Sequence, residues 1–213
     1  MTALSGAAVL DAAPVIPVVV LDDADQAVPL ARALAEGGLP IVELTLRTPV
    51  ALDAIADVAK EVPDVLVGAG TVVTPEQADA AASAGARFLV SPGSTPRLLD
   101  AMDATGLPYL PGVATVSEAL ALLERGLTAM KFFPAEASGG VGFLKSIASP
   151  VPAARFCPTG GISAKTAPDY LALPNVGCVG GSWITPPDLL QSGDWKAVTA
   201  LASTASQLAN PTA

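Results

Sequence analysis

The sequence predicts an α/β fold of the (β/α)8 barrel class, built as one domain over residues 1–213. Eight short apolar runs alternate with eight helical patterns, and no long linker or low-complexity segment lies between them. The length also fits, because a single α/β barrel runs to roughly 200–250 residues. A doubly wound open sheet is the alternative, but such a sheet would not usually need eight evenly spaced units.

The predicted strands are short apolar runs, most of them bounded by glycine, proline or polar residues. They are expected at Val15–Val20, Ile41–Leu46, Val65–Ala69, Phe88–Val90, Pro108–Pro111, Ala129–Phe133, Arg155–Pro158 and Val176–Val179. In a barrel, the functional residues lie at the carboxyl ends of the strands, so the polar residues found there carry the prediction of function.

The predicted helices follow the strands, and several have recognisable start or stop signals. Asp22–Glu36 has helical spacing and stops at Gly37-Gly38. Thr48 and Thr74 each precede a proline, which is the arrangement of an N-cap followed by proline in the first turn. The other helices are expected at Pro96–Ala104, Val116–Glu124, Gly142–Ala148, Ala164–Leu171 and within 194–208, and residues 1–13 form a leader or a helix.

Composition and charge exclude several classes of partner. Apolar residues make up 51% of the chain and aromatic residues only 4%, so the core must be built from Ala, Val, Leu and Ile. The net charge of −9 and the lack of a Lys/Arg run argue against nucleic-acid binding. No apolar run reaches the ~18 residues of a membrane span, and no basic region precedes an apolar one as in a secretory signal. Membrane association is therefore not expected.

The chain has no histidine, and this excludes whole classes of chemistry. Ser-His-Asp and Cys-His nucleophile systems need that side chain, as do His-ligated zinc and iron sites. Cys157 and Cys178 lie in separate predicted strands, fit no metal spacing and are expected to be free, buried thiols in a reducing cytoplasm. We therefore expect no metal and no cofactor, with acid–base chemistry left to Glu, Asp, Lys, Tyr, Cys or water.

Lys131 lies inside the apolar run Ala129–Phe133, which Pro134 closes. Burying an unpaired ammonium group costs several kcal/mol, so desolvation favours the neutral amine, which is a nucleophile toward carbonyl groups. The alternative is a structural lysine at a strand end, whose stem packs while its head reaches water. The run by itself does not decide between the two.

The second predicted strand carries charged residues at every other position. Because strand side chains alternate, Glu43, Thr45 and Arg47 are expected to share the inner side of the barrel. One interpretation is a Glu43–Arg47 ion pair that merely fills the barrel. The other is that Glu43 carries protons while Arg47 binds a carboxylate, for which the guanidinium fork is suited. Thr71, directly after the third strand, could add a hydroxyl group to the same pocket.

Two glycine-rich segments follow the last two predicted strands. Thr159-Gly160-Gly161 comes after the seventh strand and Gly180-Gly181-Ser182 after the eighth. Barrels often bind phosphate there, with backbone N–H groups and a helix N-terminus as donors. One Gly-Gly pair is only a turn, but two in adjacent units, each beside a hydroxyl group, favour a phosphate site. Ser163 is expected to be the N-cap of the following helix.

These groups together favour imine chemistry on a 2-keto acid. A lysine that forms an imine needs a cation for the substrate carboxylate and an acid–base group nearby, and it needs no metal. Reversible cleavage of the carbon–carbon bond beside the imine would use Lys131, Glu43, Arg47 and the two glycine segments.

Six segments of the chain, in order, also resemble those of a known enzyme family. They are Val42–Thr48, Gly68–Thr71, Ser91–Gly93, Lys131–Glu136, Arg155–Ile162 and Gly180–Trp183. The family is the class I, Schiff-base 2-keto-3-deoxy-6-phosphogluconate (KDPG) aldolases, also called 4-hydroxy-2-oxoglutarate aldolases, and the likeness spans roughly residues 14–200. It implies a homotrimer of barrels that cleaves KDPG to pyruvate and D-glyceraldehyde 3-phosphate in the Entner–Doudoroff pathway.

The resemblance also implies roles for individual residues. Lys131 would form the imine, and Glu43 would be the general acid–base. The implied substrate-binding residues are Arg47, Thr71, Pro92, Phe133 and Thr159. The implied phosphate-binding residues are Gly160, Gly161, Gly180, Gly181 and Ser182.

Three other functions remain open from the residues. A sugar-phosphate isomerase or epimerase barrel would explain the two glycine segments but would leave Lys131 and Arg47 without a role. A binding or regulatory barrel would bind a phosphorylated ligand without turnover. Within the aldolases, the galactonate-derived epimer of the substrate differs only in the configuration at C4, which the sequence does not reveal.

Overall fold

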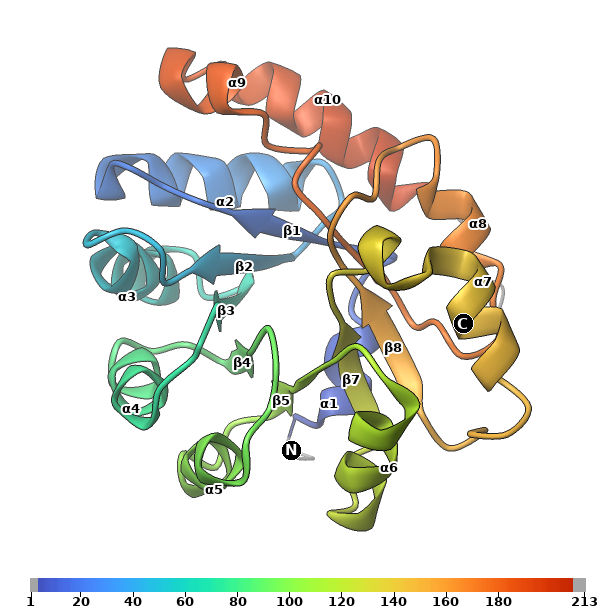
Figure 1. Cartoon of the computed structure of the whole chain (residues 1–213). Helices are drawn as coiled ribbons and strands as arrows, with labels where there is room; N and C mark the ends of the chain where they lie inside the picture. The colour runs from blue at the N-terminus through green and yellow to red at the C-terminus, as the bar shows by residue number, and fades with distance from the viewer. Residues whose placement is uncertain (1–3, 209–213) are drawn as a thin grey trace.

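The computed structural model describes residues 4–208 and shows parallel strands enclosed by an outer layer of helices (Figure 1). All of the strand pairs are parallel. The strands are β1 (Val15–Val19), β2 (Ile41–Thr45), β3 (Leu66–Gly70), β4 (Phe88–Val90), β5 (Tyr109–Leu110), β6 (Gly112–Val113), β7 (Ala129–Phe132), β8 (Arg155–Pro158) and β9 (Val179–Gly181).

The strands form two sheets, of which the larger is curled into a half-barrel. Its order is β5-β4-β3-β2-β1-β9, and the smaller sheet has the order β6-β7-β8. Pro111 separates β5 from β6, so a single run of chain passes from one sheet to the other. On the opposite side, the isolated bridges Phe156↔Val176 and Thr159↔Gly180 join the region of β8 to that of β9.

The helices lie on the outer side of the strands (Figure 1). The α-helices are α1 (Gly6–Leu10), α2 (Ala27–Glu36), α3 (Ala51–Glu61), α4 (Pro75–Ser83), α5 (Pro96–Ala104), α6 (Val116–Glu124), α7 (Gly140–Ile147), α8 (Ala167–Leu171), α9 (Pro187–Ser192) and α10 (Trp195–Ser206). Two short 3-10 helices, η1 (Ala24–Gln26) and η2 (Glu136–Ser138), precede α2 and α7.

Six predicted strands coincide with observed strands to within one residue at each end. Two predictions need correction. The run Pro108–Pro111 contains only the two residues of β5, and β6 follows it as a separate strand that was not predicted, because the chain changes pairing partner at Pro111. The strand predicted at Val176–Val179 is displaced to β9, because the ladder with β1 begins only where Val179 pairs with Val15.

The start of α4 confirms the predicted cap, whereas the predicted starts of two other helices were wrong. Thr74 caps α4 in a capping box with Gln77, followed by proline in the first turn. Thr48 is not an N-cap, because its hydroxyl donates to the Leu21 carbonyl at 2.6 Å and α3 begins only at Ala51. Ser163 is likewise outside a helix.

Ser163 and Thr166 form a turn before α8. The hydroxyl of Ser163 accepts the Thr166 backbone N–H at 3.4 Å, and α8 begins at Ala167 rather than at Ala164. The remaining differences are smaller. η1 precedes α2 within the predicted Asp22–Glu36 helix, α7 begins two residues early, and α9 was not predicted at all.

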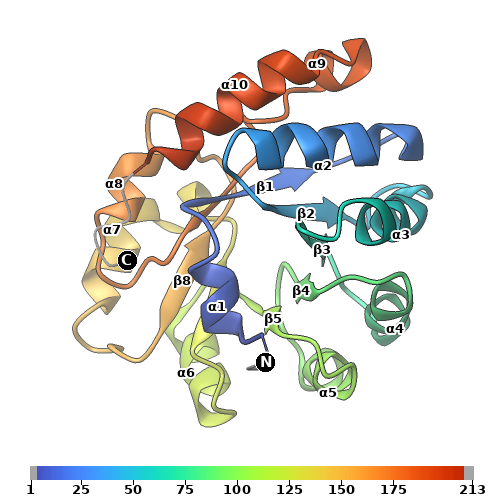
Figure 2. The ribbon, with the colours of Figure 1, turned by 180° about the vertical axis from the view of Figure 1, so that it is seen from behind.

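Helix α1 occupies part of the 1–13 segment and lies at the amino ends of β5, β7 and β8 (Figure 2). Its Val9 and Leu10 are fully buried. Gly6 approaches the side chain of Ala129 so closely that an added Cβ atom would lie 3.0 Å from it. Asp11 then accepts a hydrogen bond at 2.7 Å from the guanidinium of Arg155, the first residue of β8. The other end of the strands carries the candidate site.

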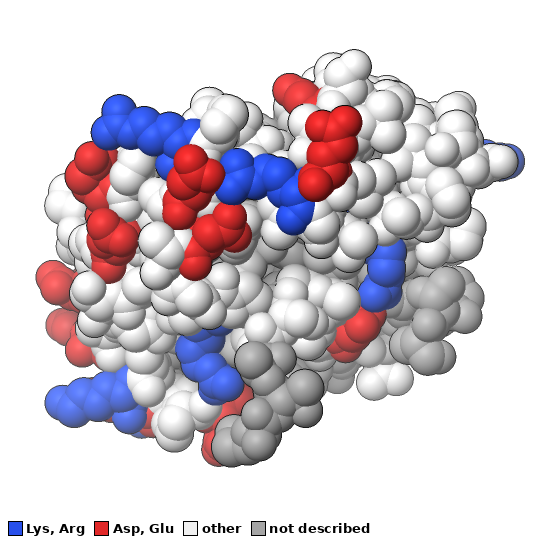
Figure 3. Space-filling view, turned by 90° about the horizontal axis from the view of Figure 1, so that it is seen from below, with Lys and Arg blue, Asp and Glu red and all other residues white. Residues whose placement is uncertain are grey.

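On the surface seen in Figure 3, acidic and basic side chains lie in small mixed groups, and uncharged areas separate these groups. On this face the basic side chains form no continuous patch. Across residues 4–208, the helices are all too short or too polar to span a bilayer.

Candidate active site

Lys131 and Glu43 form a buried ion pair between the two sheets. The Lys131 Nζ atom lies 3.2 Å from Glu43 Oε1, and each side chain is only 3% exposed. Lys131 comes from β7 in the smaller sheet, and Glu43 comes from β2 in the larger one. The predicted alternative of a Glu43–Arg47 pair is therefore wrong, since Glu43 is bonded to Lys131.

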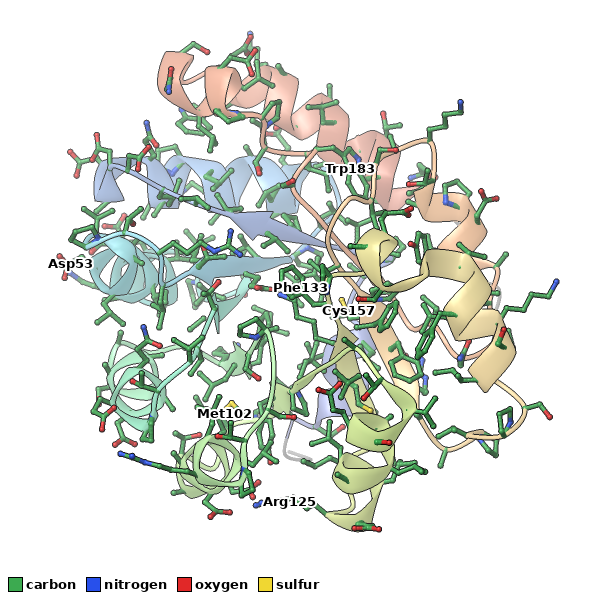
Figure 4. All side chains as sticks on the ribbon, in the orientation of Figure 1. Asp53, Met102, Arg125, Phe133, Cys157 and Trp183 are labelled. Atoms are coloured by element: carbon green, nitrogen blue, oxygen red, sulfur yellow. The ribbon has the colours of Figure 1, made fainter. Side chains whose placement is uncertain are left out.

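The ion pair places an acid–base group in contact with a nucleophile. An ammonium group must lose a proton before it can attack a carbonyl carbon, and the carboxylate at hydrogen-bond distance can accept it. The ring centroid of Phe133 lies 5.4 Å from Lys131 Nζ, within the range of a cation–π contact. Phe133 and Cys157 lie near the centre of the molecule in Figure 4, surrounded by the strands.

Close packing fixes the carboxylate of Glu43. On the neighbouring strand β3, a Cβ atom added to Gly70 would lie 2.1 Å from Glu43 Oε1 and 2.5 Å from its Cγ. Only glycine leaves room for the carboxylate there. On the same strand as Glu43, the Thr45 hydroxyl is buried and donates to the Val19 carbonyl at 2.9 Å, so Thr45 is a structural residue.

Arg47 and Thr71 meet at the carboxyl ends of β2 and β3. The Arg47 Nε–H donates to the Thr71 hydroxyl at 3.0 Å. Thr71 has φ +59°, a left-handed conformation that is costly for a β-branched residue and often marks a functional position. Arg47 itself lies in the turn after β2, with its side chain exposed.

A cavity of about 170 Å³ lies at this end of the strands. Seven of the predicted site residues line it, and they come from the ends of four strands. They are Arg47, Phe133, Thr159, Gly160, Gly161, Gly180 and Ser182.

The other predicted site residues lie outside the lining of this cavity. Lys131 and Glu43 are buried, and Lys131 lies against the ring of Phe133, which lines the cavity. Thr71 is hydrogen-bonded to Arg47, another lining residue. Pro92 packs its backbone against Gly112, which is in register with Lys131 on the neighbouring strand. Gly181 is covered by the Trp183 ring, where an added Cβ atom would lie 2.0 Å from Cζ3.

Thr159 is held tightly between β8 and β9. An added Cβ atom on Gly180 would lie 2.2 Å from the Thr159 hydroxyl oxygen, so the glycine is needed for Thr159 to occupy its place. The same hydroxyl lies 3.8 Å from the Cys157 sulfur. Gly160 and Gly161, the next two residues, have φ +104° and +82°, which explains why this loop consists of glycine.

Several residues around the site were not predicted from the sequence. Val18 and Val20 of β1 and its carboxyl end line the cavity, as does Ile162, and the two valines also line an adjoining cavity of about 320 Å³. Val18 and Val20 are two residues apart, so the alternation of side chains along β1 places them on the same side of the strand. Apolar residues in a predicted strand, however, usually indicate only a hydrophobic core. Among residues 4–208, we find no group of three or more His, Cys, Asp or Glu side chains placed to hold a metal ion.

Comparison with known proteins agrees with this site. The family model of KDPG and KHG aldolases matches residues 7–201. The 2-dehydro-3-deoxy-phosphogluconate aldolase of Dickeya dadantii is 53% identical over 91% of each chain. The KHG/KDPG aldolase of Escherichia coli is 50% identical over 93% of each chain.

A solved structure is also similar to this chain. The KDPG aldolase of Legionella pneumophila, with pyruvate captured at low pH as a covalent carbinolamine intermediate, superposes with a TM-score of 0.93 and 48% identity. The match covers 95% of this chain and 98% of that one. This chain belongs to the KDPG and KHG aldolase family.

Proposed function

We propose that this chain is a class I aldolase, a carbon–carbon lyase that cleaves KDPG reversibly to pyruvate and D-glyceraldehyde 3-phosphate. The observation that carries the proposal is the buried contact of 3.2 Å between the Lys131 amine and the Glu43 carboxylate. The carbinolamine of pyruvate in the Legionella relative supports the same chemistry. The shorter 4-hydroxy-2-oxoglutarate is a second substrate of the same reaction type.

The reaction begins at Lys131. Its amine attacks the C2 carbonyl, and loss of water from the carbinolamine gives a protonated imine. Glu43, through a water molecule, removes the proton of the C4 hydroxyl group. The C3–C4 bond then breaks, its electrons pass to the imine nitrogen, and the aldehyde leaves. The remaining enamine is protonated at C3 through Glu43, and hydrolysis of the imine releases pyruvate and restores the lysine.

The surrounding residues bind the substrate in this proposal. Arg47 and Thr71, already joined by a hydrogen bond of 3.0 Å, hold the carboxylate. Pro92 and Phe133 shape the pocket, and Thr159 contacts the substrate chain. The phosphate is bound at the two glycine segments, by Gly160, Gly161, Gly180, Gly181 and Ser182. Gly160 and Gly161 have left-handed backbone conformations, and backbone N–H groups in such turns are suited to an anion.

We further propose that the two sheets close into a single-domain (β/α)8 barrel. The continuous passage from β5 to β6 on one side and the two bridges between the regions of β8 and β9 on the other support closure. Assembly as a homotrimer in the cytoplasm completes the proposal, and both features come from the family resemblance.

Borohydride reduction in the presence of pyruvate, followed by peptide mass mapping, tests the proposed chemistry. We expect a reduced pyruvyl adduct on Lys131. The Lys131→Ala variant should lose both the adduct and KDPG cleavage, while Lys145→Ala, which changes an exposed lysine on α7, should keep both. A folded protein that forms no adduct, or forms it elsewhere, would remove the aldolase assignment and favour an isomerase or epimerase.

A further inference from the structure

A second polar contact lies behind the glycine loop that follows β8. The hydroxyl of Tyr170, a fully buried residue of α8, donates to Glu136 Oε1 at 2.6 Å. Glu136 begins η2, directly after the segment that carries Lys131 and Phe133. Figure 1 shows α8 beside α7, the helix that follows η2. Neither Tyr170 nor Glu136 has a role in the proposed reaction.

The segment containing Glu136 supports the glycine loop from behind. The Ala135 backbone N–H donates to the Thr159 carbonyl at 2.8 Å, and the Glu136 N–H donates to the Gly160 carbonyl at 3.1 Å. An added Cβ atom on Gly161 would lie 2.6 Å from the Glu136 Cγ atom. The aliphatic stem of Glu136 is therefore packed directly against Gly161.

The carboxylate of Glu136 points away from this loop. Only the Cβ and Cγ atoms of Glu136 lie within 4 Å of the Cβ position on Gly161, while its Oε2 lies 3.7 Å from the equivalent position on Gly140. Oε1 is bound to Tyr170. A carboxylate that turned toward the loop would bring negative charge to the place proposed for a phosphate, and like charges repel there.

We propose that Tyr170 and Glu136 are positioning residues for phosphate recognition. The Tyr170 hydroxyl holds the Glu136 carboxylate away from the phosphate, while the Glu136 stem keeps Gly160 and Gly161 in place. The inference rests on the proposed function, because it assumes that these two glycines bind the substrate phosphate.

The Tyr170→Phe variant tests this, because it removes the hydroxyl and retains the ring. We expect the KM for KDPG to rise about tenfold, because the released Glu136 carboxylate can then approach and repel the phosphate. The concentration of pyruvate needed for half-maximal borohydride trapping should change less than about twofold, since pyruvate has no phosphate. In the double variant Tyr170→Phe/Glu136→Gln, the KM for KDPG should return to within about threefold of the wild-type value, because the mobile side chain is then uncharged.

Three results would overturn the inference. They are an unchanged KM for KDPG in Tyr170→Phe, an equal loss of affinity for KDPG and pyruvate, and a double variant no better than the single one. The last two would assign Tyr170 a general structural role. If the wild-type protein forms no pyruvate adduct, the proposed function itself fails. An adduct with an unchanged KM in Tyr170→Phe rejects only the positioning role.

Discussion

The ion pair between Lys131 and Glu43 combines two groups that could not be buried separately. Removing one partner of a buried pair leaves an uncompensated charge, which commonly costs about 3–5 kcal/mol. A substitution that keeps the shape and the hydrogen bond is therefore the informative one. Glutamine at position 43 retains an acceptor for the lysine but can no longer take up a proton.

We expect Glu43→Gln to lower kcat about 10²- to 10⁴-fold, the usual contribution of a general acid–base. Borohydride should still trap pyruvate on Lys131, because the amine is retained and water can take up its proton during the long trapping reaction. Steady-state kinetics and mass mapping on the same preparation check both expectations. Near-normal turnover would show that another group or water moves the proton.

The glycine beside Glu43 provides a second test at the residue scale. In Gly70→Ala, the added methyl group would lie 2.1 Å from Glu43 Oε1, so the carboxylate must leave its place near Lys131. We expect turnover to fall at least about tenfold while the circular dichroism spectrum remains that of the wild type. Gly142→Ala is the matched control, because nothing lies within 4 Å of its Cβ position. Equal activity of the two variants would contradict the packing argument.

Some residues of the site could be predicted from the sequence, and others could not. Lys131 and Glu43 could be found because a charged residue in an apolar strand is rare and needs an explanation. The contact between Glu136 and Tyr170 could not be found, because they are far apart in the chain and an acidic residue after a strand usually faces solvent. Thr45 followed the alternation toward the interior, but its hydroxyl is used by a neighbouring backbone carbonyl.

At the scale of elements, the N-terminus of α6 shows how a helix start is fixed. Thr115 and Glu118 form a capping box, in which the Glu118 carboxylate accepts the Ala114 N–H at 2.8 Å and the Thr115 N–H at 2.9 Å. The bond from the Ala114 N–H is the main cause of the lowered pKa of Glu118. Burial opposes this effect by raising the pKa, and the two hydrogen bonds from Thr115 lower it further.

This cap predicts a pH-dependent contribution to stability. A carboxyl group whose pKa is lower in the folded state stabilises the protein above its unfolded pKa and loses that effect as pH falls through the folded value. Glu118→Gln should therefore lower the free energy of unfolding by about 0.5–1 kcal/mol at pH 7. The difference from wild type should disappear as pH falls from about 5 to 3.

Urea denaturation at several pH values measures this difference. Glu124→Gln, at the other end of the same helix, is the control and should show no such loss, because a negative charge near a helix C-terminus is not stabilising. A difference between Glu118→Gln and wild type that stays constant down to pH 3 would argue against the cap as its cause.

The elements that sequence analysis misplaced share a physical cause. In the C-terminal part of the chain, there is no side-chain pattern at Gly177, Gly180 and Gly181 from which a strand could be predicted. The start of β9 at Val179 is set only by its pairing with β1. Thr48 has the residues of a helix start, but a tertiary hydrogen bond to the Leu21 carbonyl takes its hydroxyl. Local sequence patterns predicted helix starts correctly where the capping hydrogen bonds are made within the same helix, as at Thr74. They failed where a hydrogen bond to a distant segment replaced the cap.

On the scale of the whole molecule, stability and chemistry are separated between the two ends of the strands. Helix α1 packs at the amino ends, while the cavity and the Arg47–Thr71 contact lie at the carboxyl ends. Barrel enzymes follow this division, because the loops at the carboxyl ends can vary without disturbing the core.

This division predicts a variant that is unstable but active. Leu10 is 0% exposed, so Leu10→Ala should lower the free energy of unfolding by about 2–5 kcal/mol. At 25 °C and without denaturant, kcat and KM for KDPG should remain within about twofold of wild type, since the site is at the other end. Leu120→Ala, at a position 47% exposed, should change stability by less than about 0.5 kcal/mol. Urea denaturation and steady-state kinetics check both, and a lower kcat in folded Leu10→Ala would show that the two ends are coupled.

The division into two sheets has a consequence for how the protein moves. Lys131 belongs to the sheet of β6, β7 and β8, whereas Glu43 belongs to the larger sheet. The distance between the two side chains therefore depends on how the two sheets pack against each other. One junction is the continuous chain through Pro111, and the other consists of two bridging residue pairs. A change in the packing of one sheet against the other would therefore change the distance between Lys131 and Glu43. Substitutions that weaken either junction should therefore lower turnover at temperatures well below those at which the protein unfolds.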